Sequence, residues 1–299
     1  MTTADGRRID FFLIGPPKCG TTTVHDVLRR HPDIFLPASK DKSYLVDAVP
    51  NYVTEDELSA YYTQYRGEVL IGCSEANLIC SASALRRLHR YNPNARLITV
   101  LRNPVERAYS AFWYWRSNLL EDCAAFEDAL AREPERERGD YRAANLCYRG
   151  QGRYAGHLEE VLALFPAENL FVALFEDLRS DPEAVLSELM SWLGVDPAKV
   201  NPEAMRQHSN AANMPRSHIV QRVFARPPSW LRGAYHAVLP ARAKAVLRAR
   251  IIEPILMCNR TPFRYPPMAA ETRAELTAYF TPHNERLAAM LGRNLEAWR

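Results

Sequence analysis

The chain has 299 residues, of which 47% are hydrophobic and 24% are charged, as in ordinary soluble globular proteins. The net charge of +3 is too small to indicate a nucleic-acid-binding protein, and no apolar run approaches the roughly 20 residues that a membrane span needs. A chain of this length forms one large α/β domain or two small ones.

Cysteine usage and the N-terminal residues bear on the compartment. The six cysteines are scattered without a C-x-x-C pair, so we predict neither a zinc site nor a thioredoxin motif. The first ten residues, MTTADGRRID, are polar and unlike a signal peptide. We therefore expect a cytoplasmic protein with reduced thiols and no bound metal.

The stretch Ile9–Arg30 reads IDFFLIGPPKCGTTTVHDVLRR and has the most informative pattern. An apolar run from Ile9 to Ile14 predicts a strand, a Gly-Pro-Pro turn follows, and a helix is expected to begin at three consecutive threonines. A strand, a glycine-bearing turn and a helix start together direct backbone N–H groups and the positive helix end at one anion. The sequence therefore predicts a phosphate cradle, with an ordinary strand-to-helix turn as the alternative.

The position of the lysine distinguishes this loop from a nucleoside-triphosphate loop. Gly15 and Gly20 keep the glycine spacing of such a loop, but Thr21 stands where its lysine is required. Lys18, inside the turn, is the only lysine of the loop. A lysine in that place contacts a different part of a nucleotide, so catalysis on a γ-phosphate is less expected.

The segment Ala38–Tyr44, after the first helix, is predicted to lie near the loop. The proline of His31-Pro32-Asp33 ends the first helix, and an extended stretch delivers Ala38–Tyr44, ASKDKSY, to a point near the loop. Asp41 lies there between two lysines, either in a solvated turn or in a functional site. A helix is predicted from Thr54 to Tyr65, and a strand from Glu68 to Cys73.

A second strand-to-helix junction follows the apolar strand predicted over Ala95–Leu101. Asn103 is a good N-cap for the helix, and Glu106 completes a capping box. The helix start offers a second anion site, with Arg102 at its mouth and Ser110 two turns along the helix. The alternative is a capped helix with a surface arginine.

The remaining chain continues the α/β pattern with a mostly parallel sheet. The aromatic residues Phe112–Trp115 pack in the core or line an acceptor cleft. His157 is predicted to be a surface histidine, and Asn169–Phe175 predicts a fourth strand. The last helix is predicted to begin with Thr281 as its N-cap and Pro282 as its first residue.

One segment of the chain is strongly basic. Met205–Ile252 contains nine Arg or Lys residues and no Asp or Glu. It forms a surface helical hairpin with solvated arginines, or it docks on an anionic membrane surface or a polyanionic acceptor.

Three stretches together resemble one family. PKCGTTTVHDVLRRHPDIFLP is similar to the 5′-phosphosulfate-binding loop of sulfotransferases that use 3′-phosphoadenosine 5′-phosphosulfate (PAPS), with the closest likeness to the bacterial and heparan-sulfate-type branch. LRNPVERAYS resembles the 3′-phosphate motif of that family, and PHNERLAAMLGRNLEAW resembles its terminal helix. The resemblance implies a P-loop-like three-layer α/β fold with a central, mostly parallel sheet flanked by helices. It also implies a single domain, residues 1–299, with a basic helical insertion at about 205–252.

The resemblance assigns roles to particular positions. Loop residues would hold the 5′-phosphosulfate: Lys18, Cys19, Gly20, Thr21, Thr22 and Thr23. Arg102 and Ser110 would hold the 3′-phosphate, and Arg260 and Arg264 would close over that side of the nucleotide. Asp41 would be the catalytic base, although relatives have the longer glutamate there and often histidine in place of Ser43. Glu75 and a histidine therefore stay open as alternative bases.

The implied reaction is transfer of a sulfuryl group from PAPS to an acceptor hydroxyl by in-line displacement, which releases adenosine 3′,5′-bisphosphate and requires no metal. The acceptor is a small molecule, a lipid or a glycan. One alternative is a nucleotide-dependent kinase of the same fold. Another is a non-catalytic module that binds anionic glycans through residues 205–252. The sequence does not predict the oligomeric state.

Overall fold

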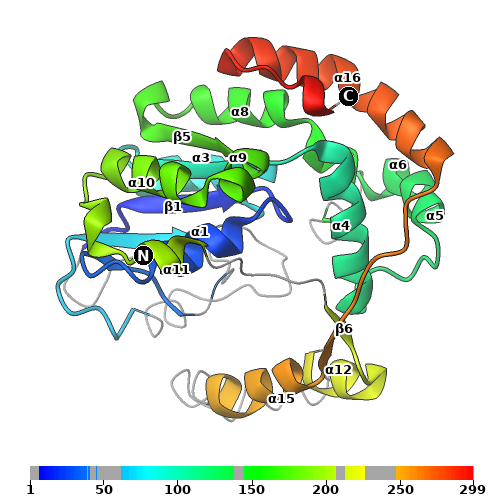
Figure 1. Cartoon of the computed structure of the whole chain (residues 1–299), viewed down its shortest axis with the longest axis horizontal. Helices are drawn as coiled ribbons and strands as arrows, with labels where there is room; N and C mark the ends of the chain where they lie inside the picture. The colour runs from blue at the N-terminus through cyan, green and yellow to red at the C-terminus, as the bar shows by residue number, and fades with distance from the viewer. Residues whose placement is uncertain are drawn as a thin grey trace.

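Five parallel strands form the centre of the molecule in the order β2-β3-β1-β4-β5 (Figure 1). The computed structural model describes residues 7–38, 40, 45, 62–137, 145–206, 213–225 and 247–298. The strands are β1 Phe11–Gly15, β2 Ile34–Phe35, β3 Leu70–Ser74, β4 Arg96–Leu101 and β5 Leu170–Leu174. The strands predicted from the sequence are confirmed to within one or two residues at their ends, whereas the helix predicted over Thr54–Tyr65 lies almost wholly outside the described residues.

The helices cover both faces and one end of this sheet. Those nearest the strands are α1 Thr21–Leu28, α3 Ala82–Tyr91, α4 Pro104–Ser117, α8 Tyr154–Leu162, α9 Phe175–Ser180, α10 Pro182–Trp192 and α11 Pro202–Arg206. The others are α5 Phe126–Ala131, α6 Glu133–Arg136, α12 His218–Ala225, α15 Glu253–Cys258 and α16 Ala270–Leu291. A mostly parallel sheet between helical layers is the predicted three-layer α/β fold.

Alternation along the strands explains why both faces are covered. On β1, Phe12 packs with α3 and α8 on one face, while Phe11 and Leu13 pack with α1 and α10 on the other. All five residues of β1 are buried. Apolar side chains on both faces of a parallel strand need a helical layer on each side, which the fold supplies.

A third apolar cluster fixes helix α4 beside the sheet. Val105 and Phe112 of α4 pack with Phe126 of α5 and with Leu276 and Phe280 of α16. Helix α4 extends from the end of the sheet toward the lower part of the molecule in Figure 1. Its position depends on contacts with a helix more than 150 residues later in the chain.

The prediction that the last helix begins at Thr281 is wrong. Helix α16 runs from Ala270 to Leu291 with Pro282 in its interior. The hydroxyl of Thr281 donates to the carbonyl of Thr277 and so does not cap a helix start. Because Leu276 and Phe280 before the proline and Leu287 after it are all buried, packing on both sides holds the helix together across it.

Residues 213–225, from the basic segment, and 247–262, which include its end, form a small unit below the sheet (Figure 1). Strands β6 Asn213–Pro215 and β7 Arg260–Pro262 pair antiparallel and connect this unit to the main body. Helices α12 and α15 pack against each other beyond the ribbon, and a π-helical turn, Arg248–Ile252, leads into α15. Within the described residues, no helix combines the length and the hydropathy that crossing a bilayer requires. All six cysteines are free thiols.

Candidate active site

The strand order brings the two predicted anion motifs to one edge of the sheet. Strand β1 lies between β3 and β4 and is parallel to both. The loop after β1 and Arg102 after β4 therefore lie next to each other, because parallel strands end at the same edge. A ligand site at the point where the strand order reverses is typical of open α/β sheets.

Glycines shape the loop between β1 and α1. Gly15 has φ +102°, and a Cβ there would lie 1.7 Å from the carbonyl oxygen of Ala76, so only glycine fits. Gly20 occupies the N-cap position of α1 with φ +88°. Among the described residues, no side chain caps this helix start. Its N-terminal N–H groups are thus arranged as in a phosphate cradle, as the sequence predicts.

Lys18 lies in the middle of this loop with φ +71°, in the left-handed region that non-glycine residues rarely occupy. Its Nζ lies 4.4 Å from the centre of the Tyr114 ring, which belongs to α4. The guanidinium of Arg102 donates from Nη1 to the Lys18 carbonyl over 3.2 Å. Lys18 is therefore in contact with both parts of the second anion motif, with helix α4 through Tyr114 and with the end of β4 through Arg102.

A second lysine lies beside the threonine cluster. The ammonium of Lys40 donates to Oγ1 of Thr21 over 2.8 Å and to Oγ1 of Thr22 over 3.1 Å. Thr21 and Thr23 are buried and Thr22 is partly exposed. The contact places Lys40 of the Ala38–Tyr44 segment beside the loop, as predicted, whereas Asp41–Tyr44 lie outside the described residues. Lys40 itself carried no predicted role, and its only signal in the sequence was membership of that segment.

The Cys19 side chain packs beneath the loop. It is fully buried, with Sγ near the Tyr154 hydroxyl at 4.0 Å. Burial raises the pKa of this thiol to about 11, despite the nearby positive charges of Arg107 and Arg102. The thiol is therefore protonated at neutral pH, so Cys19 offers an anion no charged side chain and only its backbone.

The N-terminus of α4 has its own cap, and this changes the second anion site. The Asn103 side chain accepts from the N–H groups of Val105 and Glu106, so those donors are already used. The prediction that Glu106 completes a capping box is wrong. The Asn103 N–H donates to Glu176 instead, and Glu106 pairs with Arg273 at 2.6 Å. Anion binding here depends on side chains.

Those side chains are Arg102 and Ser110. Cζ of Arg102 lies 4.7 Å from the centre of the Phe175 ring, a cation–π contact beside the end of β4. Ser110 is buried on α4, one turn before Tyr114. Arg102 and Ser110 come from one strand-helix unit, as predicted.

A buried arginine and a buried tyrosine support this unit, and sequence reasoning gave neither a role in it. Arg107 is fully buried on α4, where Nη1 donates to Oε1 of Gln151 over 3.0 Å and Nη2 donates to the Tyr148 carbonyl. The hydroxyl of Tyr154 donates to the Arg102 carbonyl over 2.8 Å.

His157 differs from its prediction as a surface residue. Its Nε2 is 3.1 Å from the Gly150 carbonyl, and burial lowers its pKa to about 4. The ring is therefore neutral at physiological pH. It fixes the turn before α8.

The catalytic base predicted at Asp41 lies outside the described residues and stays a prediction. Glu75, one alternative, directly follows β3 and is buried, with its N–H donating to the Leu13 carbonyl. His25 of α1 is the histidine in this region, and its Nδ1 is 2.7 Å from Oγ of Ser74. Both alternatives lie at the same edge of the sheet as the loop.

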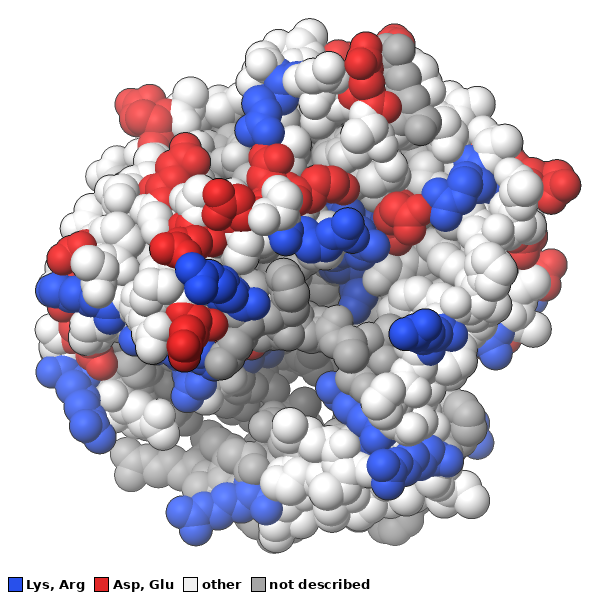
Figure 2. Space-filling view, viewed as in Figure 1, with Lys and Arg blue, Asp and Glu red and all other residues white. Residues whose placement is uncertain are grey.

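The other predicted nucleotide residues, Arg260 and Arg264, are exposed. Arg264 belongs to the strap, the segment 263–269 that joins β7 to α16, and this strap packs on α4. Tyr265 stacks on Trp113 with 5.9 Å between ring centres, and the Tyr109 hydroxyl donates to the Pro266 carbonyl. The strap thus contacts the helix that carries Ser110. On the face in Figure 2 the molecule is hollowed between the main body and the small unit, with lysine and arginine side chains around the hollow.

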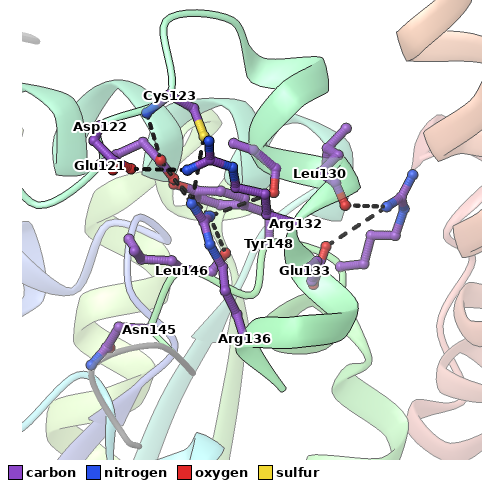
Figure 3. A network of polar contacts seen from close by, with 12 residues as sticks. Glu121, Asp122, Cys123, Leu130, Arg132, Glu133, Arg136, Asn145, Leu146 and Tyr148 are labelled. Atoms are coloured by element: carbon purple, nitrogen blue, oxygen red, sulfur yellow. Dashed lines mark hydrogen bonds and ion pairs between the residues drawn. The ribbon is translucent and has the colours of Figure 1, made fainter. Parts of the chain in front are cut away.

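A buried polar network beyond α4 is structural. Both oxygens of Glu121 accept from Arg136, at 2.7 and 2.8 Å, and Tyr148 donates to one of them (Figure 3). Glu121, Asp122 and Cys123 also bring three ligand-type atoms within 4.8 Å of one another. Because the Glu121 oxygens are already committed to Arg136 and Tyr148, this geometry is that of an ion pair that fixes the chain between α4 and α5.

Fold and site together define a class: a P-loop-type α/β protein with two anion motifs at the ends of adjacent parallel strands. The sulfotransferase domain model matches residues 8–223, more than half of the chain. The chain belongs to this sulfotransferase family and is an enzyme of that class.

Individual relatives agree with this assignment. The human bifunctional heparan sulfate N-deacetylase/N-sulfotransferase 3 is 27% identical over 96% of this chain and 31% of its own length. Human carbohydrate sulfotransferase 15 is 25% identical over 69% of this chain and 47% of its own. The chain thus spans about a third to a half of the length of these curated relatives. A solved sulfotransferase from Alicyclobacillus acidocaldarius superposes with a TM-score of 0.71 at 25% identity, covering 98% of this chain and 99% of that one.

Proposed function

We propose that the enzyme transfers a sulfuryl group from PAPS to an acceptor hydroxyl or amine by in-line displacement. The observation that carries the proposal is the direct contact between the two anion motifs, in which Arg102 donates to the Lys18 carbonyl. Two anion sites in contact fit a nucleotide with two separate phosphate groups. A nucleoside triphosphate has its phosphates in one chain and needs only the first site.

The residues of the first site fit a phosphosulfate. The uncapped start of α1 offers N–H donors, and the cradle around Gly15 has no room for a side chain. Lys18 and Lys40 bring two ammonium groups to this loop. Arg102 and Ser110 form the second site, which fits a 3′-phosphate because a guanidinium forms paired hydrogen bonds with a phosphate.

Within this arrangement Lys18 stabilises the negative charge that develops on the bridging oxygen as the sulfur–oxygen bond breaks. A preorganised donor aimed at developing charge is a large contributor to catalysis. Arg102 and Ser110 hold the donor in register with the acceptor, which reduces the entropy cost of reaction. Asp41 removes the acceptor proton, with Glu75 as the alternative base. This chemistry requires no metal.

The acceptor class that the relatives favour is a glycan. Two of the relatives are named for action on heparan sulfate and on carbohydrate. Lysine and arginine side chains lie around the hollow in Figure 2, and positive charge there would attract an anionic chain. We therefore place a glycan with free hydroxyl or amino groups ahead of a small molecule or a lipid.

The deciding experiment incubates the protein with labelled PAPS and separate acceptors: an unsulfated glycosaminoglycan, its N-deacetylated form, and a simple phenol. The proposal predicts a mass gain of one sulfate on an acceptor and release of adenosine 3′,5′-bisphosphate. A parallel reaction with Mg²⁺-ATP tests the kinase alternative. If the protein binds a glycan but no acceptor gains a sulfate, a non-catalytic glycan-binding module is favoured instead.

A further inference from the structure

Exposed apolar side chains gather on the small unit formed by α12 and α15. Of the seven large hydrophobic residues that are exposed in the described chain, four belong to this unit: Ile219, Val223, Ile251 and Met257. Ile219 is 76% exposed and Met257 is 69% exposed, and exposed apolar residues that gather in one place mark an interaction surface.

These side chains are arranged along helix faces. Ile219 and Val223 are one turn apart on α12, so they lie on the same face, and Gln221 between them is buried. Along the second helix, Ile251, Pro254 and Met257 are exposed at three-residue spacing. Each helix thus presents an apolar stripe to solvent, whereas a solvated surface hairpin presents polar residues there.

Basic side chains flank both stripes. Four exposed arginines lie in or beside the two helices: Arg216 before α12, Arg222 on α12, Arg250 in the π-helical turn and Arg260 in β7. Residues 205–252 contain no Asp or Glu, and Glu253 at the start of α15 is the one acidic residue of residues 213–225 and 247–262. No described acidic side chain forms an ion pair with any of these four arginines. Figure 2 shows Lys and Arg, and no Asp or Glu, on the described part of this unit in that view.

The two helices are held together as one surface. The N–H of Ser217 donates to Oδ1 of Asn259 over 2.9 Å, and Nδ2 of Asn259 donates back to the Ser217 carbonyl over 2.9 Å. The Arg216 N–H also donates to the Asn259 carbonyl. This clasp joins the start of α12 to the end of α15, so both stripes move as a unit on the β6–β7 ribbon.

We propose that this unit docks on an anionic lipid surface, with Ile219, Val223, Ile251 and Met257 inserted between headgroups and the flanking arginines on acidic lipids. Because both apolar and basic side chains are exposed on this unit, they distinguish a lipid surface from a polyanionic glycan or a second copy of the chain. A polyanionic glycan attracts arginines and gains nothing from exposed isoleucine and methionine, whereas a bilayer interface binds both. A second copy of the chain would bring like charges together.

The test is co-sedimentation of the whole protein with vesicles of phosphatidylcholine alone and of phosphatidylcholine with phosphatidylglycerol. Binding is expected to the mixed vesicles and to weaken with salt. The double variant Ile219→Ser/Met257→Ser should bind at least about tenfold more weakly, because it removes apolar surface that would be buried in the bilayer. Arg222→Gln should bind about fivefold more weakly.

Matched controls come from the main body. Val69 is an exposed valine and Arg66 an exposed arginine, both outside the small unit, so Val69→Ser and Arg66→Gln should bind vesicles like the unaltered protein. Three results would overturn the proposal: equal weakening by the controls, retention on heparin without binding to mixed vesicles, or a dimer in solution that Ile219→Ser/Met257→Ser dissociates. Circular dichroism of each variant excludes unfolding as the cause of lost binding.

Discussion

The Nζ atom of Lys18 lies 4.4 Å from the centre of the Tyr114 ring, so the loop lysine is in contact with the helix that carries Ser110. Tyr114 is exposed and one turn beyond Ser110. We expect Tyr114→Ala to lower kcat about three- to fivefold, since a cation–π contact at an exposed site contributes about 0.5–1 kcal/mol. Tyr114→Phe keeps the ring and should keep kcat. Equal losses in both variants would assign the effect to the hydroxyl instead.

Removal of the Lys18 ammonium should affect the chemical step most. Lys18→Ala is expected to lower kcat by roughly 10²-fold or more, the effect of losing one group that stabilises developing charge. The measurement is sulfate transfer at saturating PAPS. Lys199→Ala is the matched control, because Lys199 is a surface lysine paired with Asp33. Near-normal transfer by Lys18→Ala would remove Lys18 from the mechanism.

Arg102 is expected to act on nucleotide binding. Arg102→Ala should weaken binding of adenosine 3′,5′-bisphosphate by about tenfold or more, because a charged hydrogen bond contributes about 1.5–3 kcal/mol. Calorimetry with the whole protein measures this affinity. Arg66→Ala replaces an exposed arginine away from the sheet edge and should leave it unchanged. An unchanged affinity in Arg102→Ala would place the 3′-phosphate elsewhere.

The identity of the base is tested by removing one carboxylate at a time. Asp41→Asn should lower kcat by about 10²-fold or more and abolish the acidic limb of the pH–rate profile. Glu75→Gln is the comparison, since Glu75 is buried at the end of β3 beside the loop. Full activity in Asp41→Asn with loss in Glu75→Gln would transfer the role to Glu75.

The Glu121–Arg136 ion pair should make stability depend on acid pH. Burial by itself raises the pKa of Glu121, but hydrogen bonds from Arg136, Tyr148 and the Cys123 N–H outweigh it and lower that pKa from 4.5 to about 2. A carboxyl with a lowered folded-state pKa stabilises the fold above its unfolded pKa, and this stability is lost as the pH falls from 4.5 toward 2.

Glu121→Gln should therefore lower the free energy of unfolding by about 3–5 kcal/mol near neutral pH, because it leaves Arg136 buried without its counter-charge. The difference from the unaltered protein should shrink at acid pH. Glu137→Gln breaks the exposed pair with Arg153 and should cost at most about 1 kcal/mol. Denaturant unfolding at several pH values measures both. Equal effects of the two substitutions would contradict the structural role of Glu121.

Features set by local pattern could be predicted from the sequence. The apolar strands, the glycine loop with Lys18 and the cap at Asn103 each depend on residues within about ten positions of one another. Their meeting at one edge depends on β1 and β4 being neighbours, which the structure shows and the sequence did not predict. The protein's location and the role of Asp41 stay predictions.

Features set by tertiary contacts could not be predicted. Arg107 lies among ordinary helix-forming residues, and only the fold shows that its Nη1 and Nη2 atoms donate to Gln151 and to the Tyr148 carbonyl in the core. Helix α16 continues through Pro282 because distant apolar partners outweigh the local preference of proline for a helix start. Glu176, 70 residues beyond Glu106, accepts the hydrogen bond from the Asn103 N–H that was predicted for Glu106.

Because helix α16 lies near the end of the chain, the support that it gives to the second anion motif is available only after almost the whole chain has been synthesised. The sulfotransferase domain model ends at residue 223, yet Phe280 packs with Phe112 of the helix that carries Ser110 and lies where a Cβ on Gly152 would be. A nascent chain that ends at residue 223 thus has every residue of both anion motifs but lacks the support of the second. Donor binding should be acquired late in translation, and fragments that end before Leu291 should be substrates for chaperones and proteases.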